Sequence, residues 1–187
     1  MKVRLVTAAT IAGALALSMS GAQAAPKVLD GKTLKVLEFT GNGGAQDNDK
    51  DYAQAATGSV DRSNCQAPRC GKLTFVYKPA KGVKGDLMFT LTWANPASDI
   101  DLYVAEIGKT GDATTIAQCG GTGTASEKVF LDSSTLKAGK TYALVADYYR
   151  SLNETVKGKV EIGVPSTVKA TVPAAVDKAF LPVNCTL

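Results

Sequence analysis

Two aspartates separated by a single residue are the strongest candidates for chemistry in this chain. Asp99 and Asp101 follow a turn that begins at Asn95. On a strand this spacing places both carboxylates on one face, with Cα atoms about 7 Å apart. Together with Asn95 and backbone carbonyls of the turn, they would supply the hard oxygen ligands that Ca2+ prefers. The alternative is that Asp99 only caps the turn and Asp101 is an ordinary exposed strand residue.

A second acidic cluster consists of Asp47, Asp49 and Asp51. Acids at positions one, three and five resemble the start of an EF-hand loop. The sixth position, which needs glycine, is Tyr52, and the twelfth, which needs glutamate, is Gly58. The spacing therefore excludes an EF-hand, and it leaves either a different calcium loop or a solvated acidic loop.

Three tyrosines and an arginine form a candidate ligand face. Tyr103 closely follows the aspartates, and Tyr148, Tyr149 and Arg150 are consecutive. Tyrosine rings on a solvent face can stack on sugars or peptides. Exposed tyrosines are also common on sheets without any ligand. The pattern thus indicates a binding face but fits an unliganded surface as well.

Catalysis has little support in the sequence. The chain of 187 residues contains no histidine, which excludes Ser-His-Asp and Cys-His mechanisms and His-ligated zinc. Asp99 and Asp101 are a conceivable carboxylate pair for glycoside hydrolysis. No nucleophile elbow and no strand–glycine loop–helix for phosphate occur. We therefore expect a protein that is not an enzyme, with a glycoside hydrolase as the least favoured alternative.

Four cysteines, Cys65, Cys70, Cys119 and Cys185, are typical of two disulfides in an oxidising compartment. Four cysteines allow three pairings. The short turn between Cys65 and Cys70 favours a bond between these two. Cys119 would then pair with Cys185 and tie the C-terminal tail to the body. The C-x4-C spacing and the lack of histidine argue against a redox or metal site.

The first 24 residues have the layout of a secretory signal peptide. Two basic residues precede an apolar stretch over 5–19, and Ala22-Gln23-Ala24 is a cleavage site. Removing residues 1–24 leaves 163 residues, and the net charge of +4 falls to +2. The apolar stretch is shorter than the roughly 20 residues of a membrane span. We expect a secreted or periplasmic monomer with no membrane insertion and no nucleic acid partner.

Residues 25–187 predict a single domain built from short strands. The clearest signal is Leu87, Phe89, Leu91 and Trp93, which alternate at period two with Met88, Thr90 and Thr92. Gly/Pro/Asn turns separate the strands, and residues 41–70 form a long polar loop. The pattern predicts an antiparallel β-sandwich, with a closed barrel as the alternative. The other expected strands cover 34–40, 73–77, 100–104, 114–119, 129–131, 142–148, 156–164 and, more weakly, 167–172.

Two sequence blocks resemble the bacterial pre-peptidase C-terminal domain. The blocks are LTWANPASDIDLYV over 91–104 and LKAGKTYALVADY over 136–148, and the resemblance covers roughly residues 73–164. It implies a jelly-roll-like sandwich that accompanies secreted enzymes, and some relatives bind calcium or polymers such as collagen and polysaccharide. No protease domain is visible in this sequence, and the 41–70 loop has no counterpart that we can place in the family.

These observations predict a secreted, non-catalytic domain that binds an extracellular polymer or protein, with Ca2+ as a candidate structural ion. The alternative is a secreted inhibitor of an extracellular protease. In that case the Cys65–Cys70 loop would present Pro68 and Arg69 to a trypsin-like site as a rigid peptide.

Overall fold

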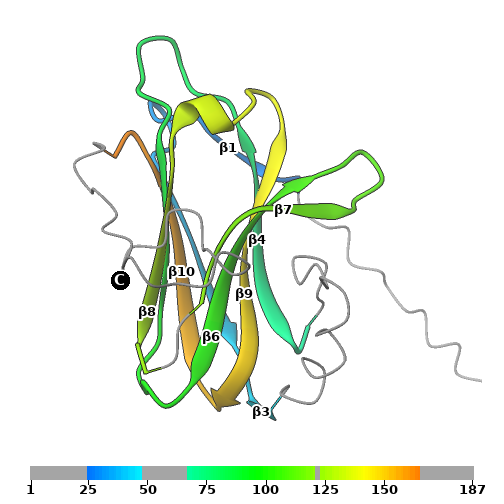
Figure 1. Cartoon of the computed structure of the whole chain (residues 1–187). Coiled ribbons are helices and arrows are strands. Elements are labelled where there is room, and N and C mark those ends of the chain that lie inside the picture. The colour runs from blue at the N-terminus through cyan, green and yellow to red at the C-terminus, as the bar shows by residue number, and fades with distance from the viewer. Residues whose placement is uncertain (1–24, 48–66, 121–122, 165–187) are drawn as a thin grey trace, which may run out of the picture.

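The computed structural model describes residues 25–47, 67–120 and 123–164, which form an all-β fold (Figure 1). These ranges contain ten strands and one short 3-10 helix, η2 (Ser133–Thr135). No helix within them is long and apolar enough to cross a membrane. The strands are β1 (Lys27–Leu29), β2 (Val36–Asn42), β3 (Ala45–Asp47), β4 (Cys70–Tyr77), β5 (Leu87–Thr92), β6 (Asp99–Ile107), β7 (Ala113–Cys119), β8 (Ser126–Leu131), β9 (Thr141–Leu152) and β10 (Thr155–Ile162).

The strands form two separate sheets. Sheet A has the order β1-β4-β9-β6-β7, and β3 also pairs with β9. Sheet B has the order β2-β10-β5-β8. Neighbouring strands are antiparallel, except that β1 runs parallel to β4. The two sheets face each other and do not close on themselves, so the predicted β-sandwich is confirmed and the closed barrel is wrong.

Alternate residues of the central strands fill the space between the sheets. Phe89 of β5 and Ile100 and Leu102 of β6 are fully buried there, as the period-two pattern predicts. Trp93 lies just beyond β5 and is also a core residue. Burying each such side chain stabilises the fold by roughly 1.5–3 kcal/mol.

The central strand β9 is buried on both faces. Tyr142 and Leu144 belong to the core between the sheets. Ala143 and Val145 point to the other face and are 0% exposed, packed with Cys70 in a second, smaller apolar cluster. This double burial explains why residues 142–146 are apolar at every position instead of at every second one.

Two three-residue strands lie where the sequence predicts none. β1 adds to the edge of β4, and β3 falls inside the predicted 41–70 loop and pairs with β9. Three residues are too few to show a period, and each strand forms because an existing strand offers it a partner. The predicted strand 34–40 is displaced to 36–42 for the related reason that its end is set by pairing with β10.

The connections that matter below gather at two opposite ends of the sandwich (Figure 1). The upper end in the figure holds the β4–β5 connection and η2, and we call it the Asp86 end. The lower end holds the β5–β6 connection and the turn from β9 to β10, and we call it the Asn95 end. That turn carries the chain from sheet A to sheet B, with Asn153 in the left-handed region at φ 68°.

Candidate functional site

The predicted acidic pair lies at the Asn95 end, on the outer face of sheet A. Asp99 and Asp101 flank Ile100, which is 0% exposed, so both carboxylates point away from the core as predicted. The register separates them, however. Asp99 is opposite Arg150 of β9, whereas Asp101 is opposite Asp147, with a bulge between the two pairs. The two acids therefore have different cross-strand neighbours.

Asp101 belongs to a row of residues that crosses sheet A. In that row Cys70 pairs with Asp147, and Asp147 pairs with Asp101. Beyond Asp101 lies Gly120, where the Asp101 carboxylate occupies the space that a Cβ would need. Two carboxylates directly opposite each other on one face repel unless a cation or a proton intervenes. Asp147 is only 2% exposed, which makes its charge costly.

Asp147 is a residue that the sequence-based prediction missed. Its signal was present, because Asp147 is the one acid in the apolar run 142–148. A charged carboxylate in a buried strand is costly unless a partner or a ligand compensates its charge. The alternation pattern placed Asp147 on the outward side of the strand, where an acidic side chain is common, so it was not singled out.

Asn95 stabilises the turn between β5 and β6 through two hydrogen bonds. Its side-chain Oδ1 accepts a hydrogen bond from the Ala97 N–H at 3.0 Å, and its carbonyl accepts one from the Ser98 N–H at 3.0 Å. Both oxygens that could ligate calcium thus stabilise the turn. Across the described ranges, no three His, Cys, Asp or Glu side chains are grouped so that they could hold a metal ion.

The second acidic cluster is only partly described. Asp47 is the last residue of β3, and its backbone pairs with Arg150. Asp49 and Asp51 lie outside the described residues. Arg150 is therefore flanked in the register by Asp47 on one side and Asp99 on the other. Both calcium sites stay predictions.

Two buried polar residues fix the β5–β6 connection. Glu154 accepts a hydrogen bond from the Ala94 N–H at 3.2 Å and one from the Ser98 hydroxyl at 3.4 Å. The Ser98 hydroxyl in turn accepts one from the Leu152 N–H at 3.1 Å. Ser98 is 0% exposed and Glu154 is 7% exposed. They are positioning residues, since they join the connection that precedes Asp99 to the turn that follows β9.

The four residues of the predicted ligand face differ in exposure. Tyr103 and Tyr149 are partly buried and Arg150 is exposed. Tyr148, in contrast, is 1% exposed and belongs to the core, so its assignment to the face is wrong. Tyr148 lies on the same side of β9 as the core residues Leu144 and Ala146. Burial raises the pKa of its hydroxyl. Its ring tip lies where a Cβ on Gly41 would be.

Tyr103 is the best-anchored member of the face. It stands between the core residues Leu102 and Val104 and therefore points outward. Its ring packs on the small outer cluster of Cys70, Ala143 and Val145. A ring held on one side by packing loses little freedom when a ligand contacts the other side.

The loop that motivated the protease-inhibitor alternative is built into the sheet. The Arg69 carbonyl accepts a hydrogen bond from the Tyr148 N–H at 3.0 Å, and Cys70 is 6% exposed. The peptide bond after Arg69 is thus part of the β4–β9 ladder. A substrate-like inhibitor must present this bond in the open, so the geometry does not favour the alternative.

Neither of the two described cysteines, Cys70 and Cys119, is a free thiol. Cys65 and Cys185 lie outside the described residues, so the pairing stays a prediction.

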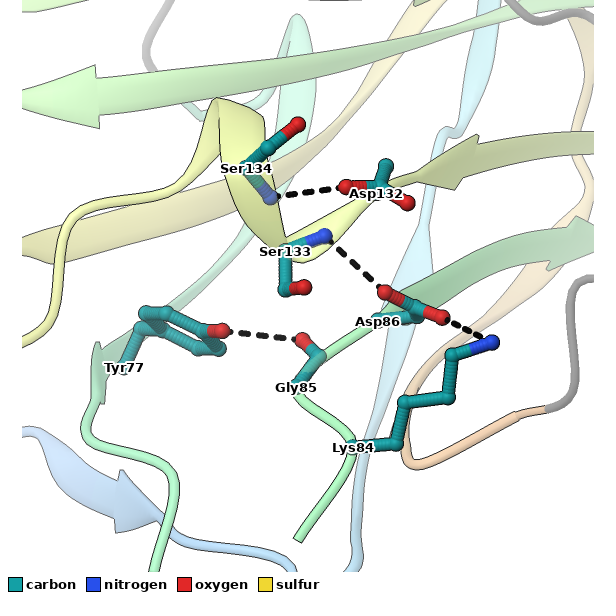
Figure 2. A network of polar contacts seen from close by, with 7 residues as sticks. All are labelled: Tyr77, Lys84, Gly85, Asp86, Asp132, Ser133 and Ser134. Carbon is teal, nitrogen blue, oxygen red and sulfur yellow. Dashed lines mark hydrogen bonds and ion pairs between the residues drawn. The ribbon is translucent and has the colours of Figure 1, made fainter.

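A separate polar network occupies the Asp86 end (Figure 2). Asp86 is 0% exposed; its Oδ1 accepts from the Ser133 N–H at 3.0 Å, and its Oδ2 lies 2.9 Å from Lys84 Nζ. Burial raises the pKa of this carboxyl, but Lys84 and Ser133 outweigh it and the net pKa is lowered. The Tyr77 hydroxyl donates to the Gly85 carbonyl at 2.9 Å.

This network is structural. Its groups satisfy one another and hold the β4–β5 connection against η2. Burial and the Asp86 charge raise the pKa of Tyr77, so its hydroxyl stays protonated and keeps donating to the Gly85 carbonyl at neutral pH.

Comparisons with known proteins assign no family. No family model matches the chain, and no curated protein matches it. Among solved structures, it is similar to the crystal structure of Yersinia pseudotuberculosis-derived mitogen, with a TM-score of 0.36 and 12% identity over 73% of this chain and 91% of that one. A likeness at this level carries no functional argument. The resemblance to the pre-peptidase C-terminal domain rests on the two sequence blocks alone.

Proposed function

We propose that the chain is a secreted, non-catalytic module that binds an extracellular polymer or protein through the outer face of sheet A at the Asn95 end. The observation that carries the proposal is that the neighbouring strands β6 and β9 carry Tyr103, Tyr149 and Arg150, which are partly buried or exposed. Tyr103 is opposite Val145, four residues before Tyr149 on β9. Tyrosine and arginine are the residue types that dominate binding energy at recognition surfaces. They also stand on rigid strands, which suits a surface that must keep its shape.

The positioning of this surface supports the same proposal. Glu154 and Ser98 lock the connection that leads into β6, and Tyr103 packs on a buried cluster. A preorganised surface loses little conformational entropy on binding.

Calcium belongs to the proposal as a structural ion for this end of the sandwich. A divalent cation would bind the partly exposed carboxylates that the sequence predicts as its ligands, Asp99 and Asp101. We expect millimolar CaCl2 to raise the melting temperature, and Asp101→Asn to abolish that rise. MgCl2 serves as the control, because Mg2+ demands a tighter octahedral site. An unchanged melting temperature in excess CaCl2 would remove calcium from the account and leave the binding proposal standing.

Co-sedimentation tests the binding proposal. Wild-type protein is mixed with insoluble chitin, peptidoglycan or collagen fibres, and the bound fraction is measured after centrifugation. We expect at least one polymer to retain the protein, and Tyr149→Ala and Arg150→Ala each to weaken retention about 5- to 30-fold, as loss of an anchor residue does.

Each variant has a matched control on sheet B. Phe130→Ala removes a partly buried aromatic ring, and Lys157→Ala removes an exposed cation, both from the outer face of the opposite sheet. Equal losses in the control variants would contradict the assignment of the face. If none of the three polymers retains the protein, a protein partner is sought instead by chemical cross-linking at Tyr149.

A further inference from the structure

Three of the four strands that end the two sheets are protected against pairing with another chain. Among the described strands, β1 and β7 end sheet A, and β2 and β8 end sheet B. β1 has only three residues, and the pairing of β7 with β6 shifts register between Val104 and Ala105. β8 exposes Lys128 and turns Glu127 inward, where it is fully buried. Short strands, irregular pairing and charged residues are the means by which proteins keep sheet edges apart.

β2 is the least protected of the four. Its seven residues pair with β10 in an unbroken register, with no proline and a single charged side chain, Glu38. Val36, at its start, is 39% exposed. The ring of Phe39, its largest side chain, lies over Gly158 of β10, where a Cβ would overlap it. The outer edge of β2 is therefore long, regular and clear of bulky side chains, which is the form that pairs with another strand.

The backbone of β2 turns every second residue toward this outer edge. The Ile162 N–H donates to the Lys35 carbonyl, and the Gly43 N–H donates to the Glu154 carbonyl. Both pairs continue the register of β2 with β10, so in this antiparallel ladder the odd-numbered residues of β2 bond to β10. The N–H and carbonyl groups of the even-numbered residues point the other way, where no described strand lies. These residues are Val36, Glu38, Thr40 and Asn42.

We propose that β2 is a dimer interface, at which a second copy of the chain adds its own β2 antiparallel across a twofold axis at Phe39. In this register all seven residues of each strand are paired, and Glu38 lies opposite the partner's Thr40. The four even-numbered residues of each strand then form about eight hydrogen bonds across the axis. The same edge serves both copies, so the pair is closed. The dimer replaces the monomer expected from the sequence, and its interface lies on sheet B, whereas the proposed binding face lies on sheet A.

The charges around Glu38 fit a second copy in this register. An axis at Glu38 itself would set two carboxylates directly opposite each other, which destabilises a strand pair. With the axis at Phe39, the partner's Thr40 is opposite Glu38. The next residue in that row is the partner's Lys157, because Lys157 of β10 pairs with Thr40. Two strand spacings, about 10 Å between Cα atoms, separate the carboxylate residue from this lysine, and their two long side chains can span that distance.

Glu38 is available for this contact. Its own neighbour on β10 is Lys159, but the Lys159 ammonium pairs with Glu161 at 2.7 Å. Glu38 and Lys157 are both exposed, and neither has an ion-pair partner within the described ranges. By symmetry the dimer contains the contact between Glu38 and the partner's Lys157 twice. This self-complementary pattern favours a second copy of the chain over an unrelated strand.

Sedimentation velocity of the exported chain tests the dimer. An interface of one strand pair is small, so we expect monomer and dimer to exchange between about 1 and 200 µM. Thr40→Pro removes an outward N–H and keeps the bonds of the odd-numbered residues to β10, and it should raise the dissociation constant at least about tenfold. The matched control is Ser126→Pro on the outer edge of β8. The Trp93 N–H donates to the Ala125 carbonyl in register with β5, so the Ser126 N–H also points outward, and this variant should leave the dimer unchanged.

A charge reversal tests the register without a proline, so a misfolded Thr40→Pro chain cannot obscure the result. Glu38→Lys and Lys157→Glu should each raise the dissociation constant several-fold, and the double variant should return it to within about twofold of the wild type. A wild-type chain that stays monomeric at about 200 µM would overturn the proposal. So would a dimer that Ser126→Pro weakens as much as Thr40→Pro does, or a double variant that dimerises no more tightly than the single variants.

Discussion

Replacing Asp86 by alanine should destabilise the fold by about 2–4 kcal/mol. The carboxylate is fully buried and accepts from the Ser133 N–H at 3.0 Å. A hydrogen bond to a charged acceptor contributes about 1.5–3 kcal/mol, and the donor left behind inside the protein adds to the loss. The ion pair with Lys84 adds less than about 1 kcal/mol, because the Lys84 side chain is 56% exposed.

Urea denaturation followed by tryptophan fluorescence measures these losses, with the slope of the transition expected to stay constant. Asp86→Asn keeps an acceptor for Ser133 and should cost about half as much as Asp86→Ala. Lys84→Ala should cost less than about 1 kcal/mol. If Lys84→Ala destabilises as much as Asp86→Ala, the ion pair and not the buried hydrogen bond holds this end, and the reasoning is refuted.

The pH dependence of the same variants follows from the pKa of Asp86. It is lower in the folded protein than the ordinary value of 3.8, so the unfolded chain binds more protons once the pH falls toward that value. The contribution of Asp86 to stability is present above about pH 4 and disappears as the pH falls below it. Asp86→Asn should flatten this part of the stability curve, whereas an identical curve would contradict the assignment.

Three further predictions follow from local geometry. Glu154→Ala should cost about 2–4 kcal/mol in urea denaturation, since it leaves the buried Ser98 hydroxyl and the Ala94 N–H without their acceptor; a loss below about 0.5 kcal/mol would contradict its positioning role. Gly158→Ala should cost about 1–3 kcal/mol or more because its Cβ would overlap the Phe39 ring, and Phe39→Leu in the same chain should recover part of the loss. Asp30 accepts three backbone N–H groups, so its carboxyl should titrate at a pKa of about 2 in an NMR titration, and a value near 4 would show that this turn is open in solution.

The fold was predictable where side chains alternate over many residues. β5 and the first half of β6 were found from Phe89, Leu91, Ile100 and Leu102, because one face of each lies against the other sheet. The predicted alternation was a poorer guide to β9, which is buried on both faces. The short strands β1 and β3 depend on partners far away in the chain, and no local pattern encodes them.

The candidate site was predictable as a set of residue types and less so as an arrangement. Asp99, Asp101 and Tyr103 point outward as the spacing indicates. A bulge in the β6–β9 pairing places Asp99 opposite Arg150 and Asp101 opposite Asp147. This bulge has no signature in the sequence. Long-range register thus decides which charges meet, and single-strand periodicity does not.

Hydroxyl-radical footprinting of the protein on the polymer that retains it tests the central claim most directly. The account predicts that binding lowers the oxidation of Tyr103 and Tyr149 on sheet A at least several-fold. Oxidation of Phe130 on the outer face of sheet B should stay unchanged. Protection of Phe130 together with unaltered oxidation of Tyr103 and Tyr149 would place the ligand on the other sheet and contradict the account.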